Sequence, residues 1–380
     1  MDFELPEEHR LLRDNVLNFS RREIAPLADA METEGQFPPT LWPELGELGV
    51  LGVGIPEQFG GSGLDLLAGV VCIEQIARAS GSVALSYGAH TNLCAQNLYR
   101  NGTQSQRERY LPPLCSGAAI GALAITEPEA GSDAVGLQMR AVRDGDDYVL
   151  NGTKMFITNG PLADTLIVYA KTDPSANGRG ITAFIVESEF PGFSVSRKLE
   201  KWGHKASPTA ELVLEDCRVP AGNVLGREND GASVMFSGLD SERIFLSGEP
   251  LGIAEEALEL SVAYAKQRKQ FGQAIGEFQM IQAKLADMYT TIEAARLLTY
   301  RAAVHAEENG ADVHRQAAAA ILFTAETATK VCLDAMQIHG GYGYLTELPF
   351  GRMLADAKLL EIGAGTSEIR RLIIARELLK

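Results

Sequence analysis

The residues best suited to chemistry form a small turn near the C-terminus, Gly363-Ala364-Gly365, and a helix start follows it. Small residues let backbone N–H groups approach a bound molecule closely, because no side chain stands in the way. Thr366 or Ser367 can cap the helix that begins there. The sequence therefore predicts a turn that offers backbone hydrogen-bond donors to a ligand. Ala364 supplies no acid, so a catalytic base has to come from another part of the chain.

Two stretches near the middle of the chain combine hydroxyl groups, glycines and an aromatic ring. The first, Leu123–Asp133, ends in a Gly-Ser-Asp turn, and such a loop offers backbone donors and hydroxyls to a planar ligand with polar edges. The second, Phe156–Gly160, indicates a strand that runs into an Asn-Gly turn. On composition alone, an ordinary turn between domains is the better interpretation of the first, and a plain strand end of the second.

Composition and motifs exclude several classes of protein. The chain has 380 residues and a net charge of −16, so we expect neither nucleic-acid nor membrane binding. The five cysteines are scattered without a CxxC spacing, which predicts no metal site and suits a reducing compartment. Gly52-Val53-Gly54 lacks the third glycine of a dinucleotide fingerprint. The acidic N-terminus resembles neither a signal nor a transit peptide, so a cytoplasmic location is expected, or the mitochondrial matrix for a mature eukaryotic form.

The elements that must position these residues fall into three blocks. Residues 1–120 show helical periodicity with Pro and Gly breaks, residues 121–230 show short β-like runs, and residues 231–380 are helical again. Asp144-Gly145-Asp146-Asp147 predicts a hairpin turn. Long helical segments near 233–268, 277–308 and 312–338 predict a bundle. The predicted fold is α+β: an N-terminal helical domain, a middle β-barrel or sandwich domain, and a C-terminal four-helix bundle.

Seven motifs together give the chain a family resemblance. They are Ser86–His90, Thr126–Asp133, Ile157–Gly160, Ser237–Arg243, Arg268–Gly272, Gln337–Gly341 and the tail from Leu360 to Arg371. Each motif alone is weak, but in this order they make the chain resemble the acyl-CoA dehydrogenase family over essentially its whole length. Within the family, the isovaleryl-CoA branch is the most similar.

This resemblance implies FAD bound between the β domain and the C-terminal helices. The flavin ring would be held by the first loop and covered by the second, and the adenine-diphosphate end would reach a neighbouring subunit. Arginine suits the diphosphate because it clamps phosphate bidentately. The implied cofactor contacts are Leu123, Ala124, Ile125, Thr126, Gly131, Ser132, Phe156, Ile157, Thr158, Arg268, Phe271, Gln279, Gln337, Ile338, His339, Gly340, Gly341, Thr366, Ser367 and Glu368.

The resemblance also implies that Glu242 is the catalytic base. In most of the family a glutamate at the position of Ala364 removes the substrate proton, whereas in the isovaleryl-CoA branch the base stands at the position of Glu242. Desolvation would raise the pKa of this carboxylate and strengthen it as a base. Without the resemblance, Glu242 would be interpreted as a solvated helix charge. Glu249, about two helical turns on, is the second candidate, and Glu361 and Glu368 are weaker ones.

A thioester site is implied around the tail turn. The N–H of Ala364 would donate to the thioester carbonyl, and such donors are typically worth about 10²–10³ in rate. The implied substrate contacts are Ser132, Asp240, Arg243, Leu360, Gly363, Ala364 and Gly365. Leu360 stands where the isovaleryl-CoA branch carries tyrosine, and Ala355 and Lys205-Ala206 also depart from its pattern, which leaves the acyl group open.

The implied reaction is FAD-dependent α,β-dehydrogenation of a short branched-chain acyl-CoA, with isovaleryl-CoA to 3-methylcrotonyl-CoA as the leading case. Glu242 would abstract the α proton while a hydride passes to flavin N5. Electron-transfer flavoprotein would be the acceptor, and the chain would form a homotetramer. Alternatives are another acyl group, an oxidase or monooxygenase of the same fold, and a non-catalytic acyl-CoA-binding protein.

Overall fold

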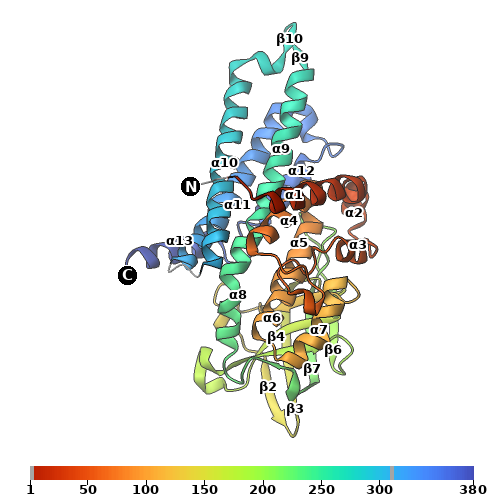
Figure 1. The fold of residues 1–380 in the computed structure, drawn as a ribbon, viewed down its shortest axis with the longest axis vertical. Coiled ribbons are helices and arrows are strands. Elements are labelled where there is room, and N and C mark those ends of the chain that lie inside the picture. Colours follow the sequence, from red (N-terminus) through yellow and green to blue (C-terminus); the bar gives the residue numbers. More distant parts are fainter. Residues whose placement is uncertain (1–3, 309–311) are drawn as a thin grey trace.

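The computed structural model describes residues 4–308 and 312–380 and confirms the predicted α+β order of helices, sheet and helices (Figure 1). The sheet lies at one end of an elongated molecule, and the small hairpin β9–β10 lies at the other end (Figure 1). The N-terminal helices are α1 (Glu7–Phe19), α2 (Ala28–Glu34), α3 (Leu41–Glu47), α4 (Leu66–Ala79), α5 (Gly81–Gly88), α6 (Asn97–Asn101) and α7 (Gln104–Ser116).

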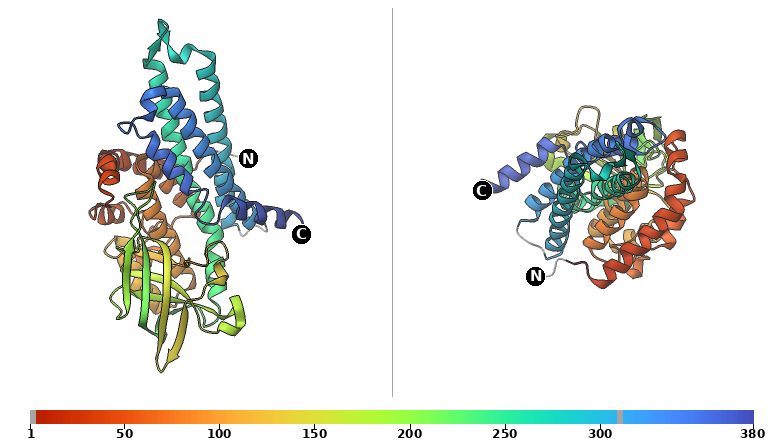
Figure 2. Two further views of the ribbon diagram at one scale, coloured as in Figure 1. Left: turned by 180° about the vertical axis from the view of Figure 1, so that it is seen from behind. Right: turned by 90° about the horizontal axis from the view of Figure 1, so that it is seen from above.

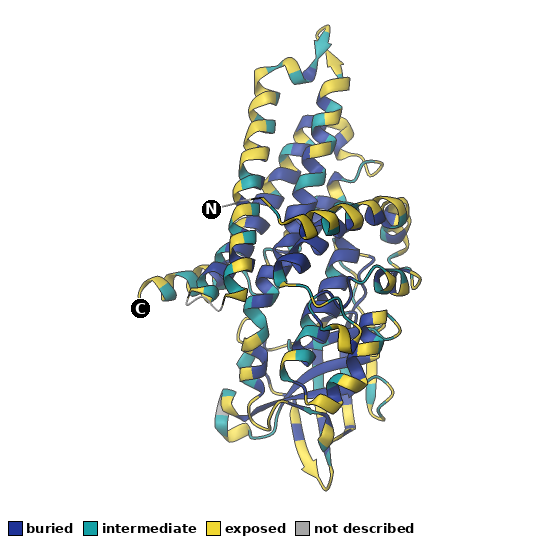
Figure 3. Ribbon diagram, viewed as in Figure 1, coloured by how far each residue is buried: buried dark blue, intermediate teal, exposed yellow. Residues whose placement is uncertain are grey.

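Helices α4 and α5 form the centre of the molecule, where their residues are almost entirely buried (Figure 3). Asp65 caps α4 by accepting a hydrogen bond from the N–H of Ala68 at 2.8 Å. Ser80 ends α4 and caps α5 by accepting from Val83 at 3.3 Å. These side chains fix the helix boundaries because each satisfies a backbone donor that the helix itself leaves unpaired.

The middle block is a mixed sheet with the order β6-β7-β3-β2-β4-β5-β8, and β1 pairs in parallel with β4 (Figure 2, left). The hairpin predicted at residues 144–147 is confirmed, with Asp144 opposite Asp147 and Gly145 at a positive φ of 64°. The strands of the mixed sheet are β1 (Gly121–Ala124), β2 (Arg140–Asp144), β3 (Asp147–Thr158), β4 (Thr165–Lys171), β5 (Ile181–Glu187), β6 (Phe193–Lys198), β7 (Thr209–Pro220) and β8 (Val224–Leu225).

The C-terminal block packs α9, α10 and α11 side by side, with α8 extending toward the sheet (Figures 1 and 2). The helical segment predicted near 233–268 is present as two helices, α8 and α9, which meet at Ser247. Pro250 has no N–H and its ring crowds the carbonyl of Leu246, which disfavours a continuous helix there. The elements are α8 (Gly231–Leu246), α9 (Gly248–Gln267), β9 (Lys269–Gln270), β10 (Gln273–Ala274), α10 (Gln279–Glu307), α11 (Val313–His339), α12 (Phe350–Leu359) and α13 (Ser367–Leu378).

Neither a membrane span nor a metal-binding cluster is found in the described ranges. No helix there is long and apolar enough to cross a bilayer. No group of three or more His, Cys, Asp or Glu side chains there is arranged to hold a metal ion.

Candidate active site

Glu242 lies on α8, half-buried next to two arginines. Burial raises the pKa of Glu242 to about 7, although Arg243 and Arg370 act in the opposite direction. The interpretation as a solvated helix charge therefore does not describe this residue. A carboxylate that titrates near neutral pH is well matched to proton abstraction, because it combines basicity with a large ionised fraction.

The tail turn joins α12 to α13 and has an open backbone donor. Ala364 has a positive φ of 53°, which is uncommon for a residue with a side chain, and Gly365 follows at 89°. Thr366 caps α13 by accepting from the N–H of Ile369 at 3.3 Å, as predicted for this position. Within the described chain, the N–H of Ala364 has no hydrogen-bond acceptor. The turn thus presents a free backbone donor from a residue held in a special conformation.

Two arginines hold the carbonyl groups of this turn. Arg370 is fully buried and donates to the carbonyl oxygens of Leu360 at 2.7 Å and Gly363 at 2.6 Å. Arg243 reaches the carbonyl of Ala364 from α8, with its Nε at 3.4 Å. Arg370 was missed by sequence reasoning, which treated it only as part of the tail motif. The signal that could have found it is the tight turn itself, whose carbonyls need donors from outside the helices.

Asp240 and Arg243, both predicted substrate contacts, are engaged with protein groups in this structure. Arg243 Nη1 lies 3.0 Å from Asp240 Oδ1, and His314 Nδ1 lies 2.8 Å from the same oxygen. The chain of contacts connects α11 through Asp240 and Arg243 to the carbonyl of Ala364. These residues therefore anchor the turn to α8, close to Glu242.

The two predicted cofactor loops lie side by side. The N–H of Met155 on β3 donates to Thr126 O at 2.8 Å, and Lys154 donates from Nζ to Ile125 O at 2.9 Å. Lys154 is fully buried and also pairs with Glu127 at 2.8 Å. These contacts hold the loop that follows β1 against the end of β3, where the side chain of Phe156 is exposed.

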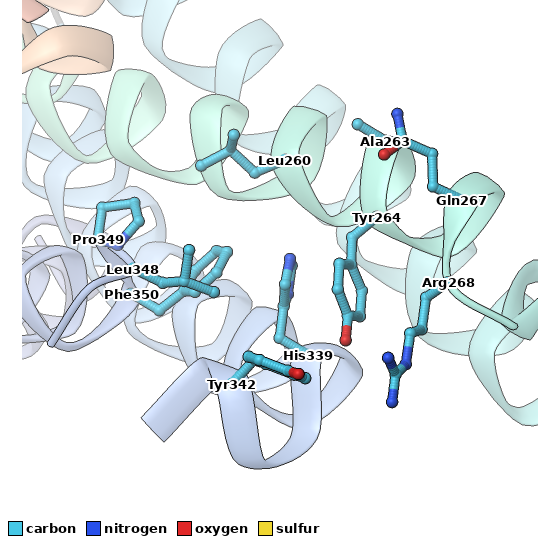
Figure 4. Close-up of a pocket in the computed structure, with 10 residues that line it drawn as sticks. All are labelled: Leu260, Ala263, Tyr264, Gln267, Arg268, His339, Tyr342, Leu348, Pro349 and Phe350. Carbon is cyan, nitrogen blue, oxygen red and sulfur yellow. The ribbon is translucent and has the colours of Figure 1, made fainter. Parts of the chain in front are cut away.

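A second group of predicted cofactor residues lies elsewhere, in two adjoining cavities of about 370 and 480 Å³ near the C-terminal ends of α9 and α11. His339 stacks on Tyr264 with ring centroids 4.2 Å apart, and Arg268 lies over Tyr342 at 5.5 Å (Figure 4). The residues shared by both cavities are Tyr264, Arg268, His339 and Tyr342; Ile338, Gly340 and Gly341 line one of them. Phe271, Gln279 and Gln337 are exposed. Arg268 directly precedes β9, so this region lies at the opposite end of the molecule from the sheet. The two groups of predicted cofactor residues are therefore far apart within one chain (Figure 1).

Several candidates are placed away from an open site. Leu360 is only 1% exposed and packs in the core, which does not support a role in lining an acyl pocket. Glu249 is fully enclosed, and its Oε1 lies 2.6 Å from Nε2 of His204. Glu361 accepts hydrogen bonds from Thr329 and Lys358. Glu368 is exposed at the start of α13 and fits the helix terminus rather than proton transfer.

Three family descriptions match the chain in sequence order. The N-terminal domain of acyl-CoA dehydrogenases matches residues 6–118, the middle domain matches 122–217, and the C-terminal domain matches 229–379. The chain belongs to the acyl-CoA dehydrogenase family. Members are flavin-dependent oxidoreductases, so this acyl-CoA dehydrogenase is an FAD enzyme.

Named relatives and solved structures agree with this assignment. Isovaleryl-CoA dehydrogenase of Pongo abelii is 52% identical over 98% of this chain and 89% of its own length. The 2-methylacyl-CoA dehydrogenase of Solanum tuberosum is 49% identical over 99% and 92%. Butyryl-CoA dehydrogenase of Megasphaera elsdenii covers both chains completely, with a TM-score of 0.97 and 41% identity. A structure described as the FAD complex of PigA gives 0.95 and 33%, over 100% of this chain and 99% of its own.

The described residues fit FAD. Phe156 is 66% exposed at a positive φ of 61°, so its ring stands free at the end of β3. Gly131 and Ser132 are exposed, and a Cβ at Gly131 would meet no atom within 4 Å. The Ser367 hydroxyl is buried and has no hydrogen-bond partner in the part of the chain that is described. A free aromatic face, an open backbone and an orphaned hydroxyl are what a flat, polar-edged cofactor requires.

Proposed function

We propose that this acyl-CoA dehydrogenase converts a short branched-chain acyl-CoA to its 2,3-enoyl-CoA, with isovaleryl-CoA and 3-methylcrotonyl-CoA as the leading pair. The observation that carries the proposal is Glu242, a half-buried carboxylate with a pKa of about 7 beside a tail turn that has no acid of its own. The names of the 52% and 49% identical relatives support a branched acyl group. Because the two names differ, they do not fix which carbon of the acyl chain carries the branch.

The chain's own residues perform the acid–base half of the reaction. Glu242 takes the α proton, so the C–H bond breaks and its electron pair moves toward the thioester carbonyl. The N–H of Ala364 donates to the carbonyl oxygen, where negative charge develops. FAD, when bound, supplies the acceptor for the hydride that leaves the β carbon. Glu242 ends the step protonated, and its ionised form is restored by loss of that proton to solvent.

FAD would be held by two groups of residues in different subunits. The loop 123–132 and the end of β3 would hold the flavin, with Thr366 and Ser367 at the start of α13. Arg268, Phe271, Gln279 and the Gln337–Gly341 segment would hold the adenine-diphosphate end of a neighbour's cofactor. The distance between the two regions along the molecule supports this division. We therefore propose a homotetramer, a dimer of dimers, in which each cofactor site is completed by a second copy.

Flavin bleaching by acyl-CoA under anaerobic conditions tests the assignment. Wild-type protein should bleach fastest with short branched acyl-CoAs, and Glu242→Gln should retain FAD while losing about 10²–10⁴ in bleaching rate. Glu361→Gln is the matched control and should bleach normally. Near-normal bleaching by Glu242→Gln would overturn the choice of base, whereas preference for a straight-chain acyl-CoA would overturn only the choice of substrate.

The electron acceptor is tested in the same preparation. We propose electron-transfer flavoprotein, so turnover should require that protein or an artificial acceptor. Oxygen consumption without an added acceptor would favour an oxidase or monooxygenase of the same fold instead. A purified protein that binds acyl-CoA but no flavin would favour a non-catalytic binding protein.

A further inference from the structure

Arg370 is a fully enclosed cation behind the tail turn. Its two terminal nitrogens donate to Leu360 O and Gly363 O, and its Nε has no partner among the described residues. Burial and the nearby Arg243 lower the pKa of Arg370 to about 10, whereas Glu242, Glu326 and Glu361 act to raise it. The guanidinium therefore stays charged at neutral pH, at the point where the chain turns toward the proposed thioester site.

The carbonyl held by Arg370 and the free donor of the turn belong to the same peptide unit. Gly363 contributes the C=O and Ala364 the N–H, and the described peptide bonds are all trans. In a trans peptide the two groups point in opposite directions, so fixing one direction fixes the other. A hydrogen bond to the carbonyl also polarises the peptide and makes its N–H a stronger donor.

We propose that Arg370 is a positioning residue for the dehydrogenation, which aims and polarises the Ala364 N–H at the thioester oxygen. The inference rests on the proposed function and extends it to a residue that touches neither substrate nor cofactor. Arg243 assists by holding the next carbonyl, that of Ala364, at 3.4 Å. Together the two guanidiniums fix both sides of the donor residue.

Charge balance during proton transfer agrees with this role. Before the step, the negative charge is on Glu242, whose pKa is raised by burial while Arg243 and Arg370 act against that rise. As the proton moves to Glu242, negative charge develops on the thioester oxygen at the Ala364 N–H. The charge therefore moves within the field of the same two guanidiniums, and the site does not have to create a new ion in a low-dielectric region.

The test measures how strongly the turn stabilises an enolate, independently of turnover. A 3-oxoacyl-CoA ionises to an enolate, and the pH of ionisation when it is bound can be followed by ultraviolet absorbance. The measurement is made in a Glu242→Gln background with FAD, so that residue 242 does not titrate. Adding Arg370→Gln should raise the ionisation pH by at least one unit, a tenfold loss, while the affinity for a saturated acyl-CoA changes less than threefold. Arg371→Gln is the control, because Arg371 is exposed and pairs with Glu326.

Steady-state turnover of Arg370 variants that keep Glu242 provides the second measurement. Arg370→Gln and Arg370→Lys should both lower kcat at least tenfold with little change in KM, and the lysine variant, which keeps the charge, should be the less affected. An unchanged ionisation pH in the folded variants would overturn the role of Arg370, even if stability fell. Failure of the proposed function has a different signature, since it would appear as normal bleaching by Glu242→Gln with Arg370 intact.

Discussion

The Nε2 atom of His204 lies 2.6 Å from Oε1 of Glu249, and both side chains are completely excluded from solvent. The backbone N–H of His204 also donates to Asp356 at 2.6 Å. Burial alone would lower the pKa of His204, but Asp356 and Glu249 together raise it above the usual value. A buried histidine between two acidic side chains thus joins the loop before β7 to α9 and α12.

Replacing Glu249 should damage stability rather than chemistry. Glu249→Ala breaks a buried ion pair and removes the hydrogen-bond partner of His204 Nε2, so the free energy of unfolding should fall by about 3–5 kcal/mol. Because the pKa of His204 is raised in the folded state, the contribution of its charge is complete below about pH 6.5 and is lost as the pH rises through the folded-state pKa. Urea unfolding measures the change, with the exposed Glu277→Ala as control. A folded, FAD-containing variant without activity would instead identify Glu249 as the base.

The pH dependence of kcat/KM should report Glu242. The residue must be ionised to accept a proton, so the rate should rise about tenfold per pH unit on the acid side and level off above a pKa of about 7. Since Arg370 lowers this pKa, Arg370→Gln should move the limb to higher pH. Steady-state rates from pH 5.5 to 9 provide the measurement. A profile that is flat across this range would show that no group with such a pKa controls the reaction.

The ion pair under the cofactor loop should be needed for FAD binding. Glu127 accepts from Lys154 and from the N–H groups of Gln138 and Met139, at 2.8, 2.5 and 3.0 Å. Glu127→Gln leaves the ammonium group of Lys154 buried without a counter-charge, which should cost about 3–5 kcal/mol of stability and release FAD. Visible absorbance of the purified protein measures the FAD content. The exposed Glu129→Gln on the same loop should remain yellow, and equal loss in both variants would contradict the prediction.

Local physics made parts of this fold predictable. The bounds of α4, Leu66–Ala79, follow from the sequence itself, because a continuous apolar pattern lies between polar residues that can end a helix. The hairpin turn at residues 144–147 follows from its Asp-Gly-Asp-Asp composition, which tolerates a positive φ at Gly145. Such features depend only on residues that are close together in the sequence, so the sequence alone is enough to predict them.

Other features depend on contacts between distant segments and could not be predicted in this way. Glu242 looks like a surface charge until α8 is placed against the tail turn, and Arg370 lies in a helix whose exposed neighbours give no sign that it is buried. Lys154 alternates normally along β3, yet its side chain points into the domain and pairs with Glu127. In each case burial shifts the pKa of an ordinary charged side chain, and burial is set by tertiary packing.

The residues that line the cavity at Arg268 should bind the cofactor of a neighbouring subunit. Two inactive variants should therefore complement each other in a mixed oligomer. Arg268→Ala removes the proposed diphosphate clamp but keeps Glu242, and Glu242→Gln keeps the clamp but removes the base. In a mixed oligomer, the Arg268→Ala subunit would have its FAD held by Arg268 of the Glu242→Gln subunit. That site contains both an intact base and an intact clamp, so activity should return.

The experiment mixes the two variants, dissociates and reassembles them, and measures acyl-CoA dehydrogenation with FAD in excess. If half of the subunits carry each change and assort at random, about a quarter of the sites should be fully restored, because a site needs its own Glu242 and a neighbour's Arg268. Each variant treated alone controls for reassembly. If Arg268 served the cofactor of its own chain, no combination of these subunits would contain a complete site, and the mixture would stay as inactive as its components.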